Sequence, residues 1–104
     1  MELEAHTVIL LRWPEGMHEF EESELEALQL RHLAYLDSLR ESGKLLVTGP
    51  LANQPDESWR GIAIYAVDRD EALRLASADP SVQAGRLEAV AFDWLVQPGQ
   101  LHFG

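Results

Sequence analysis

The sequence predicts an α+β fold whose elements follow the order β-α-β-β-α-β. Three observations lead to this fold class: four short segments rich in β-branched and aromatic residues, two segments with helical periodicity, and a turn-rich stretch that joins the second and third strands directly. This order is the split βαβ arrangement, a four-stranded antiparallel sheet with two helices on one face. We expect one domain over residues 1–104, with a core at about 6–97 and a short tail at 98–104.

The first half of the chain supplies one strand and one long helix. Ala5 to Trp13 is apolar on both alternating sets of positions, which predicts a strand. Leucines then recur on one side of a helix over Glu19 to Glu41, and Gly43 follows as a C-terminal stop. Glutamates crowd the start of this helix, where the positive end of the helix dipole favours them. We interpret this acidic cluster as a solvated helix surface.

The second half of the chain begins with a hairpin. Lys44 to Leu51 predicts the second strand, and the Gly49-Pro50 pair bends or stops it because proline lacks a ladder donor. Residues 53–58 are typical of a turn, and Trp59 to Val67 predicts a third strand that pairs back on the second.

A second helix and a fourth strand complete the chain. Asp68 is a candidate N-cap for the second helix, with Glu71 three positions later as in a capping box. Asp79 opens a short further turn that Gly85 ends, and Arg86 to Gln97 predicts the last strand.

Both faces of the predicted sheet are apolar. In the first strand Ile9 and Leu11 lie on one face, whereas Val8 and Leu10 lie on the other. Helices cover one face only, so the other requires a different cover. A chain of 104 residues also builds a modest core. We therefore expect a homodimer that packs through its sheet faces.

Composition excludes several classes of protein. The chain has 8 Lys+Arg against 18 Asp+Glu, a net charge of −10, and it is 46% hydrophobic. These values argue against disorder and against a nucleic-acid partner, which needs a basic face. The uninterrupted apolar runs are far shorter than the roughly 20 residues that a membrane span needs. The absence of cysteine excludes disulfides, thiolate nucleophiles and Cys-ligated metals. The acidic start of the chain does not resemble a targeting segment, so we expect a cytoplasmic location.

His32 and Asp79 are the candidate catalytic residues. His32 interrupts the apolar stripe of the first helix between Leu28 and Leu36, where burial of an unpaired imidazole costs about 1–3 kcal/mol. It is either a hydrogen-bonded core histidine or a general acid/base, because imidazoles exchange protons near neutrality. Asp79 precedes Pro80, a pattern that N-capping alone produces.

The remaining motifs are less specific. Gly49-Pro50 by itself indicates a backbone role at a strand end, because glycine allows close approach of the chain and proline fixes φ. His6, His18 and His102 are scattered, without the spacing of a metal site. There is no Gly-rich phosphate loop and no nucleophile elbow, so we expect neither a metal nor a cofactor.

Taken together, three segments resemble the YCII-related (YciI-like) family. They are Arg31 to Leu36, Gly43 to Leu51, and Glu71-Ala72 with Ala78 to Gly85. The resemblance implies a ferredoxin-like fold assembled as a dimeric α+β barrel. It also implies a His/Asp pair, carried here by His32 and Asp79, with Gly49 and Pro50 lining the same pocket. One position departs from the family pattern: Ser81 stands where many relatives have an aromatic residue.

Two functional hypotheses follow. The first is a small cofactor-independent enzyme of lyase or isomerase type, which uses the His32–Asp79 pair for proton transfer or elimination on a small cyclic or aromatic molecule. Its pocket is expected between the first helix and the sheet, walled by Leu28, Tyr35 and Leu36. The alternative is a non-catalytic ligand-binding or interaction module with a structural His-Asp pair. Both hypotheses predict an Asp79 carboxylate oxygen within hydrogen-bond reach of a His32 ring nitrogen, either directly or through one water molecule.

Overall fold

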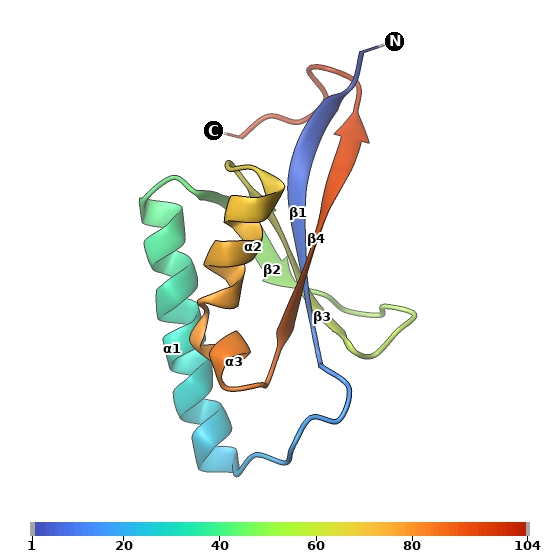
Figure 1. Ribbon diagram of the computed structural model, residues 1–104. Coiled ribbons are helices and arrows are strands. Elements are labelled where there is room, and N and C mark those ends of the chain that lie inside the picture. The colour runs from blue at the N-terminus through green and yellow to red at the C-terminus, as the bar shows by residue number, and fades with distance from the viewer. Residues whose placement is uncertain (1, 104) are drawn as a thin grey trace.

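A computed structural model describes residues 2–103 and confirms the predicted α+β class and element order (Figure 1). The elements are β1 (Glu4–Arg12), α1 (Glu22–Glu41), β2 (Leu45–Pro50), β3 (Trp59–Tyr65), α2 (Arg69–Ser77), α3 (Pro80–Gln83) and β4 (Glu88–Val96). The four-residue α3 forms where a short turn was expected. Among these helices none is both long and apolar enough to cross a bilayer.

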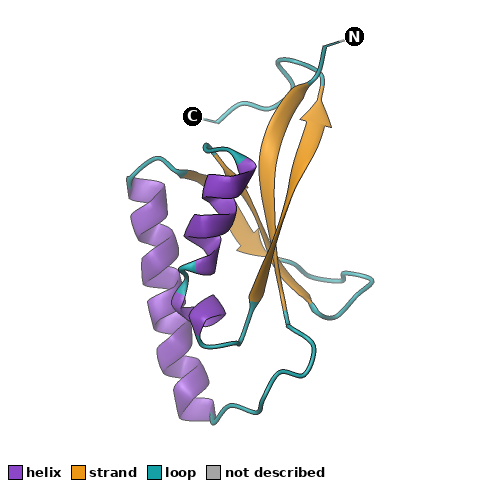
Figure 2. Ribbon diagram, in the orientation of Figure 1, coloured by secondary structure: helices purple, strands orange, loops and turns teal. Residues whose placement is uncertain are grey.

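The sheet is antiparallel throughout, with the strand order β2-β3-β1-β4. Ile9 of β1 lies opposite Ala63 on β3 and Ala91 on β4, so these three side chains share one face. All helices lie on one side of the sheet (Figure 2). The sheet therefore has one face covered by helices and one open face.

The core lies between the sheet and the helices. Ile9, only 1% exposed, packs in one cluster with Tyr65 of β3, Leu36 of α1 and Leu75 of α2. The leucines of α1 and the alternating residues of β1 thus meet as their periodicities predict.

Most strand ends differ from the prediction by one or two residues, and two differences, at α1 and β3, have a clear cause. Helix α1 begins at Glu22 rather than Glu19, because Glu21 is its N-cap and its backbone N–H donates to Glu24 Oε1 at 3.2 Å. Strand β3 ends at Tyr65 rather than Val67, because Leu45 at the start of β2 is its last partner.

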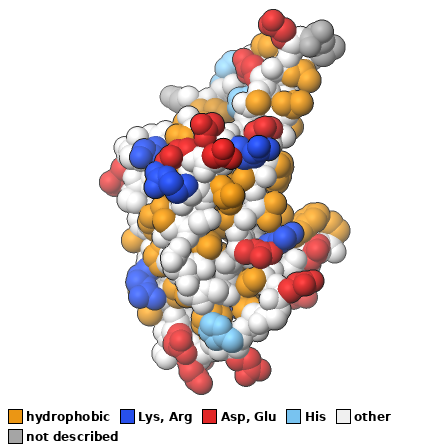
Figure 3. Space-filling model, viewed as in Figure 1, with side chains coloured by type: hydrophobic (Ala, Val, Ile, Leu, Met, Phe, Trp, Pro, Cys, Tyr) orange, Lys and Arg blue, Asp and Glu red, His pale blue; other side chains and the backbone are white. Residues whose placement is uncertain are grey.

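The start of α1 is acidic, as the charge pattern of the sequence predicted. Figure 3 shows acidic side chains at the lower end of the molecule, where α1 begins.

The open face is apolar and incompletely covered. Val8, at its centre, is 3% exposed and lies opposite Ile64 and Phe92. Around it, the exposed fractions rise to 41% for Ile62 and 47% for Trp94. The neighbouring side chains on this face bury Val8, but they remain partly exposed themselves.

Candidate active site

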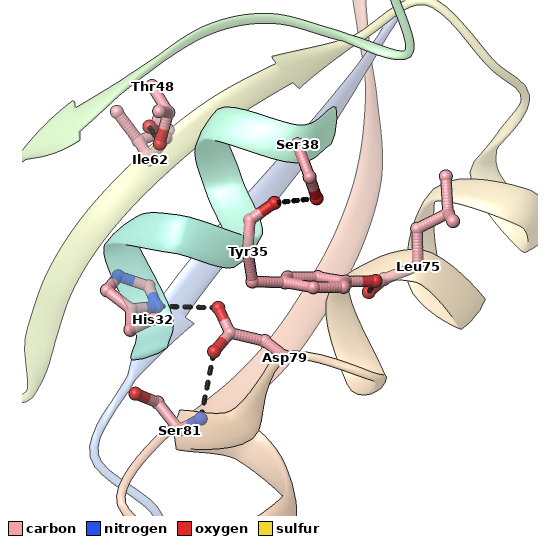
Figure 4. A network of polar contacts seen from close by, with 8 residues as sticks. All are labelled: His32, Tyr35, Ser38, Thr48, Ile62, Leu75, Asp79 and Ser81. Carbon is pink, nitrogen blue, oxygen red and sulfur yellow. Dashed lines mark hydrogen bonds and ion pairs between the residues drawn. The ribbon is translucent and has the colours of Figure 1, made fainter. Parts of the chain in front are cut away.

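His32 and Asp79 form a direct contact between α1 and the start of α3 (Figure 4). His32 Nδ1 lies 2.6 Å from Asp79 Oδ2. The side chains are 12% and 2% exposed, so the pair is largely shielded from water. The predicted hydrogen bond between these residues is confirmed, across 47 positions of sequence.

Asp79 also caps α3, as its position before Pro80 predicted. Its Oδ1 accepts the backbone N–H of Ser81 at 2.8 Å, while Oδ2 faces His32. One carboxylate thus fulfils both interpretations offered by the sequence, N-cap and histidine partner. Because each oxygen has its own partner, the carboxylate is fixed in orientation.

The contact determines which ring nitrogen of His32 is available for chemistry. An ionised carboxylate only accepts hydrogen bonds, so Nδ1 carries the proton and, in the neutral imidazole, Nε2 keeps its lone pair. Within residues 2–103, Nε2 has no hydrogen-bond partner and is not one of the fully enclosed unpaired atoms. Figure 4 shows this second nitrogen directed away from Asp79. The arrangement presents a basic nitrogen whose opposite side is held by a carboxylate.

Two tyrosines surround the pair from the core side. The Tyr35 hydroxyl donates to the carbonyl oxygen of Leu75 at 2.6 Å and so joins α1 to α2, four residues before Asp79. Burial raises the pKa of Tyr35 above its ordinary value, and the negative charge of Asp79 adds to the rise. Burial also raises the pKa of Tyr65 to about 12, with further contributions from Tyr35 and Asp79. Both phenols therefore stay neutral at physiological pH.

The predicted pocket residues occupy three different places. Leu28 lines a hollow of about 540 Å³ between α1 and the α3–β4 turn, here called the α1–α3 hollow, together with Leu25, Gln29, Ser81 and Arg86. Leu36 is part of the core, and Tyr35 packs against that core. The α1–α3 hollow therefore lies between helices rather than between α1 and the sheet. It adjoins the pair through Ser81, whose backbone N–H Asp79 accepts, while neither His32 nor Asp79 is among its lining residues.

Gly49 and Pro50 line a separate hollow. Its volume is about 290 Å³, and its other lining residues include Val8, Ile62 and Trp94 of the open face. A Cβ added to Gly49 would meet nothing within 4 Å, so this glycine borders open space. Among the described residues, this hollow is lined by neither His32 nor Asp79.

Sequence reasoning did not single out Arg86, which lines the α1–α3 hollow. The Gly85 turn, with φ at +78°, reverses the chain so that the Arg86 backbone N–H donates to the carbonyl oxygen of Ser81 at 3.0 Å. This places Arg86 beside the residue that Asp79 holds. The available signal was a basic residue next to a turn in a chain with few basic residues, which is too general to single it out. In the described part of the chain no group of three or more His, Cys, Asp or Glu residues could hold a metal ion.

Comparisons with known proteins support the fold. A solved structure of 5-chloro-2-hydroxyhydroquinone dehydrochlorinase from Burkholderia phenoliruptrix, in complex with 2,5-dihydroxybenzoquinone, is 24% identical with a TM-score of 0.50. The match covers 86% of this chain and 92% of that one. No match is found among curated proteins. The YCII-related domain matches residues 8–93, which is most of the sequence, and the chain therefore belongs to the YCII-related family.

Proposed function

We propose that the protein is a small cofactor-independent enzyme that moves a proton on a small cyclic or aromatic substrate, with His32 as the general base. The observation that carries this proposal is the geometry of the pair: Nδ1 is held by Asp79 at 2.6 Å, while Nε2 is unpaired among the described residues. A base oriented by a carboxylate on its far side is the arrangement that general-base catalysis uses.

The chemistry follows from the free nitrogen. Nε2 accepts a proton from a carbon next to a carbonyl or from a ring hydroxyl, and the electron pair left behind forms a new double bond. In an elimination, a leaving group such as chloride departs with its bonding pair. In an isomerisation, the imidazolium returns the proton to another carbon. Asp79 stabilises the imidazolium during either sequence because its carboxylate contacts the Nδ1–H.

The fold neighbour offers a concrete first substrate. That protein is a dehydrochlorinase, and its structure holds a dihydroxybenzoquinone. Loss of hydrogen chloride from a chlorinated hydroxyhydroquinone requires proton removal and chloride departure, which a His-Asp pair can assist without a cofactor. This similarity supports an elimination on a ring compound.

A second function remains in competition, because Asp79 has a structural role in capping α3 through the Ser81 N–H. In this alternative the protein binds a small ligand without turnover, and His32 merely satisfies the second carboxylate oxygen. A structural pair lost on mutation costs stability, whereas a catalytic pair costs rate.

The test begins with a screen of small ring compounds, including 5-chloro-2-hydroxyhydroquinone, for shifts in melting temperature. Compounds that bind are assayed for chloride release or for exchange of carbon-bound hydrogen with deuterium, followed by NMR. We expect His32→Ala to lower the rate by about 100-fold or more while the fold is retained, because helices tolerate alanine. His102→Ala, at an exposed position of the tail, is the matched control and should leave the rate unchanged.

Asp79→Asn separates the cap from the charge. The amide oxygen can still accept the Ser81 N–H, but the negative charge facing His32 is lost. The proposal expects a lower rate with a nearly unchanged melting temperature. The alternative function is established instead if the wild type turns over none of the ligands that it binds, and if His32→Ala loses about 1–3 kcal/mol of stability while ligand affinity stays as in the wild type.

A further inference from the structure

Arg86 carries a positive charge that no acidic side chain of the described residues contacts. Within residues 2–103 its guanidinium has one polar contact, from Nη1 to the sulfur of Met17 at 3.7 Å, and it takes part in no ion pair. Its Cζ instead lies 5.4 Å from the ring centre of Trp13 and 6.0 Å from that of Phe20. The aromatic rings hold the guanidinium in place while most of its N–H donors stay free. In a chain with 18 acidic residues, an unpaired arginine at the edge of a hollow is an available anion-binding group.

A second unpaired donor lines the same hollow. Ser81 is 3% exposed, yet within the described chain its hydroxyl has no hydrogen-bond partner and is not among the fully enclosed unpaired atoms. Ser81 is one of the residues that line the α1–α3 hollow. Figure 4 shows this hydroxyl on the same side of the Asp79 carboxylate as the His32 ring. A buried hydroxyl without a partner is costly unless a ligand or water satisfies it.

The rest of the hollow indicates what else a ligand must contain. Leu25 and Leu28 supply an apolar wall, and a volume of about 540 Å³ is within the range of small-molecule sites. Glu22 and Glu26 also line the hollow, but both are exposed, so water and salt screen their charges over about 8 Å. The hollow therefore has one cationic lining residue, Arg86, an apolar wall along α1 and acidic side chains only at its rim.

We propose that the α1–α3 hollow binds the carboxylate group of a small apolar acid, with the Arg86 guanidinium as its charged anchor and the Ser81 hydroxyl as a second donor. Guanidinium and carboxylate match in geometry and charge, and paired N–H donors favour a carboxylate over a single-atom anion. This proposal rests on the proposed function for its biological meaning: it makes a carboxylate-bearing ring compound the substrate class. The binding site itself stands on the geometry of Arg86 and Ser81.

The experiment measures binding of benzoate, with neutral benzamide as the isosteric comparison, by calorimetry and by the NMR signals of His32. We expect saturable benzoate binding to the wild type and at least a tenfold weaker affinity in Arg86→Gln, with benzamide affected less than twofold. Ser81→Ala should weaken benzoate about threefold, because one neutral donor is lost while the backbone N–H that holds Asp79 remains.

Arg60→Gln is the matched control. Its guanidinium also lies over the Trp13 ring, at 4.4 Å, but Arg60 does not line the hollow. It should bind benzoate within twofold of the wild type, so that a general loss of ring contacts is distinguished from loss of the anchor.

Three results would overturn the binding site: no saturable benzoate binding to the wild type, unchanged affinity in Arg86→Gln, or an equal loss in Arg60→Gln. His32→Ala keeps its benzoate affinity if the site is correct, whatever happens to catalysis. Failure of the proposed catalytic function therefore leaves benzoate binding intact, and failure of the binding site leaves His32-dependent turnover intact.

Discussion

Ile9 and Val8 are neighbours in β1 and almost equally buried, at 1% and 3% exposure, yet they belong to different surroundings. Ile9 is enclosed by α1, α2 and β3 side chains in the core. Val8 lies on the open face, where Phe92 and Trp94 remain 42% and 47% exposed. The apolar residues on the helix-covered face of the sheet are thus buried in a core, whereas many of those on the open face remain exposed to solvent.

The two faces of the sheet therefore suit different roles: the helix-covered side for the candidate active site and the open side for contact with a second subunit. The covered face holds the polar groups that need fixed partners, with Asp79 between His32 and Ser81 and with Tyr35 bonded to Leu75. The open face presents a broad apolar surface, which is typical of an interface between subunits. We propose that a second copy of the chain covers it, sheet against sheet.

The largest expected effect is on the open face. If a partner covers Trp94, roughly 100 Å² of apolar surface leaves water, worth about 2.5 kcal/mol per protomer and twice that in a two-fold dimer. Trp94→Ala should therefore weaken dimerisation by nearly four powers of ten, about 5 kcal/mol, measured by sedimentation equilibrium. Leu95→Ala is the matched control, because Leu95 is 58% exposed and points to the opposite side of β4.

A wild type that sediments as a monomer at micromolar concentration would contradict this proposal. Equal weakening by Trp94→Ala and Leu95→Ala would also contradict it, since the interface would not then be specific to the open face.

The next effect is on the covered face. Ile9→Ala removes a fully enclosed side chain from the core and should lower the free energy of unfolding by about 2–5 kcal/mol. The loss should persist at every protein concentration, because the cavity lies within one protomer, whereas losses on the open face should depend on concentration. Urea denaturation at two concentrations measures both, and a loss below about 1 kcal/mol would show that the covered face is not tightly packed.

The smallest effect concerns the polar part of the covered face. Tyr65 has a pKa of about 12 in the folded protein, while the unfolded value is near 10. Between these two pH values the unfolded chain has lost its phenol proton and the folded chain keeps it, so stability falls as pH rises. The slope should be on the order of 1 kcal/mol per pH unit.

Tyr65→Phe should remove that slope while leaving the response of other groups unchanged. The measurement is the difference in unfolding free energy between wild type and variant from pH 9 to 12, and a difference independent of pH would argue against a buried neutral phenol.

Prediction from sequence succeeded where periodicity carries the information. The leucines of α1 and the alternation in β1 identified the element order, both apolar faces and the unusual place of His32, because each follows from local spacing. The predicted N-cap of α2 is also confirmed, because it depends on residues close in sequence: the Asp68 side chain accepts the backbone N–H of Glu71 at 2.8 Å. The structure begins helix α1 three residues after the predicted start at Glu19. The reason is the capping box of Glu21 and Glu24, which sets the first turn and which the leucine periodicity does not reveal.

The α+β class and the apolar sheet faces can be predicted from the sequence alone, and the family resemblance identifies the two candidate catalytic residues. Only the tertiary structure decided that Asp79 divides its two oxygens between His32 and Ser81, and that Gly49 lines a different hollow. It also placed Arg86 beside Ser81 with its charge unpaired. The physical reason is range: periodicity and capping act over a few residues, whereas a site depends on side chains that the fold brings together from distant elements.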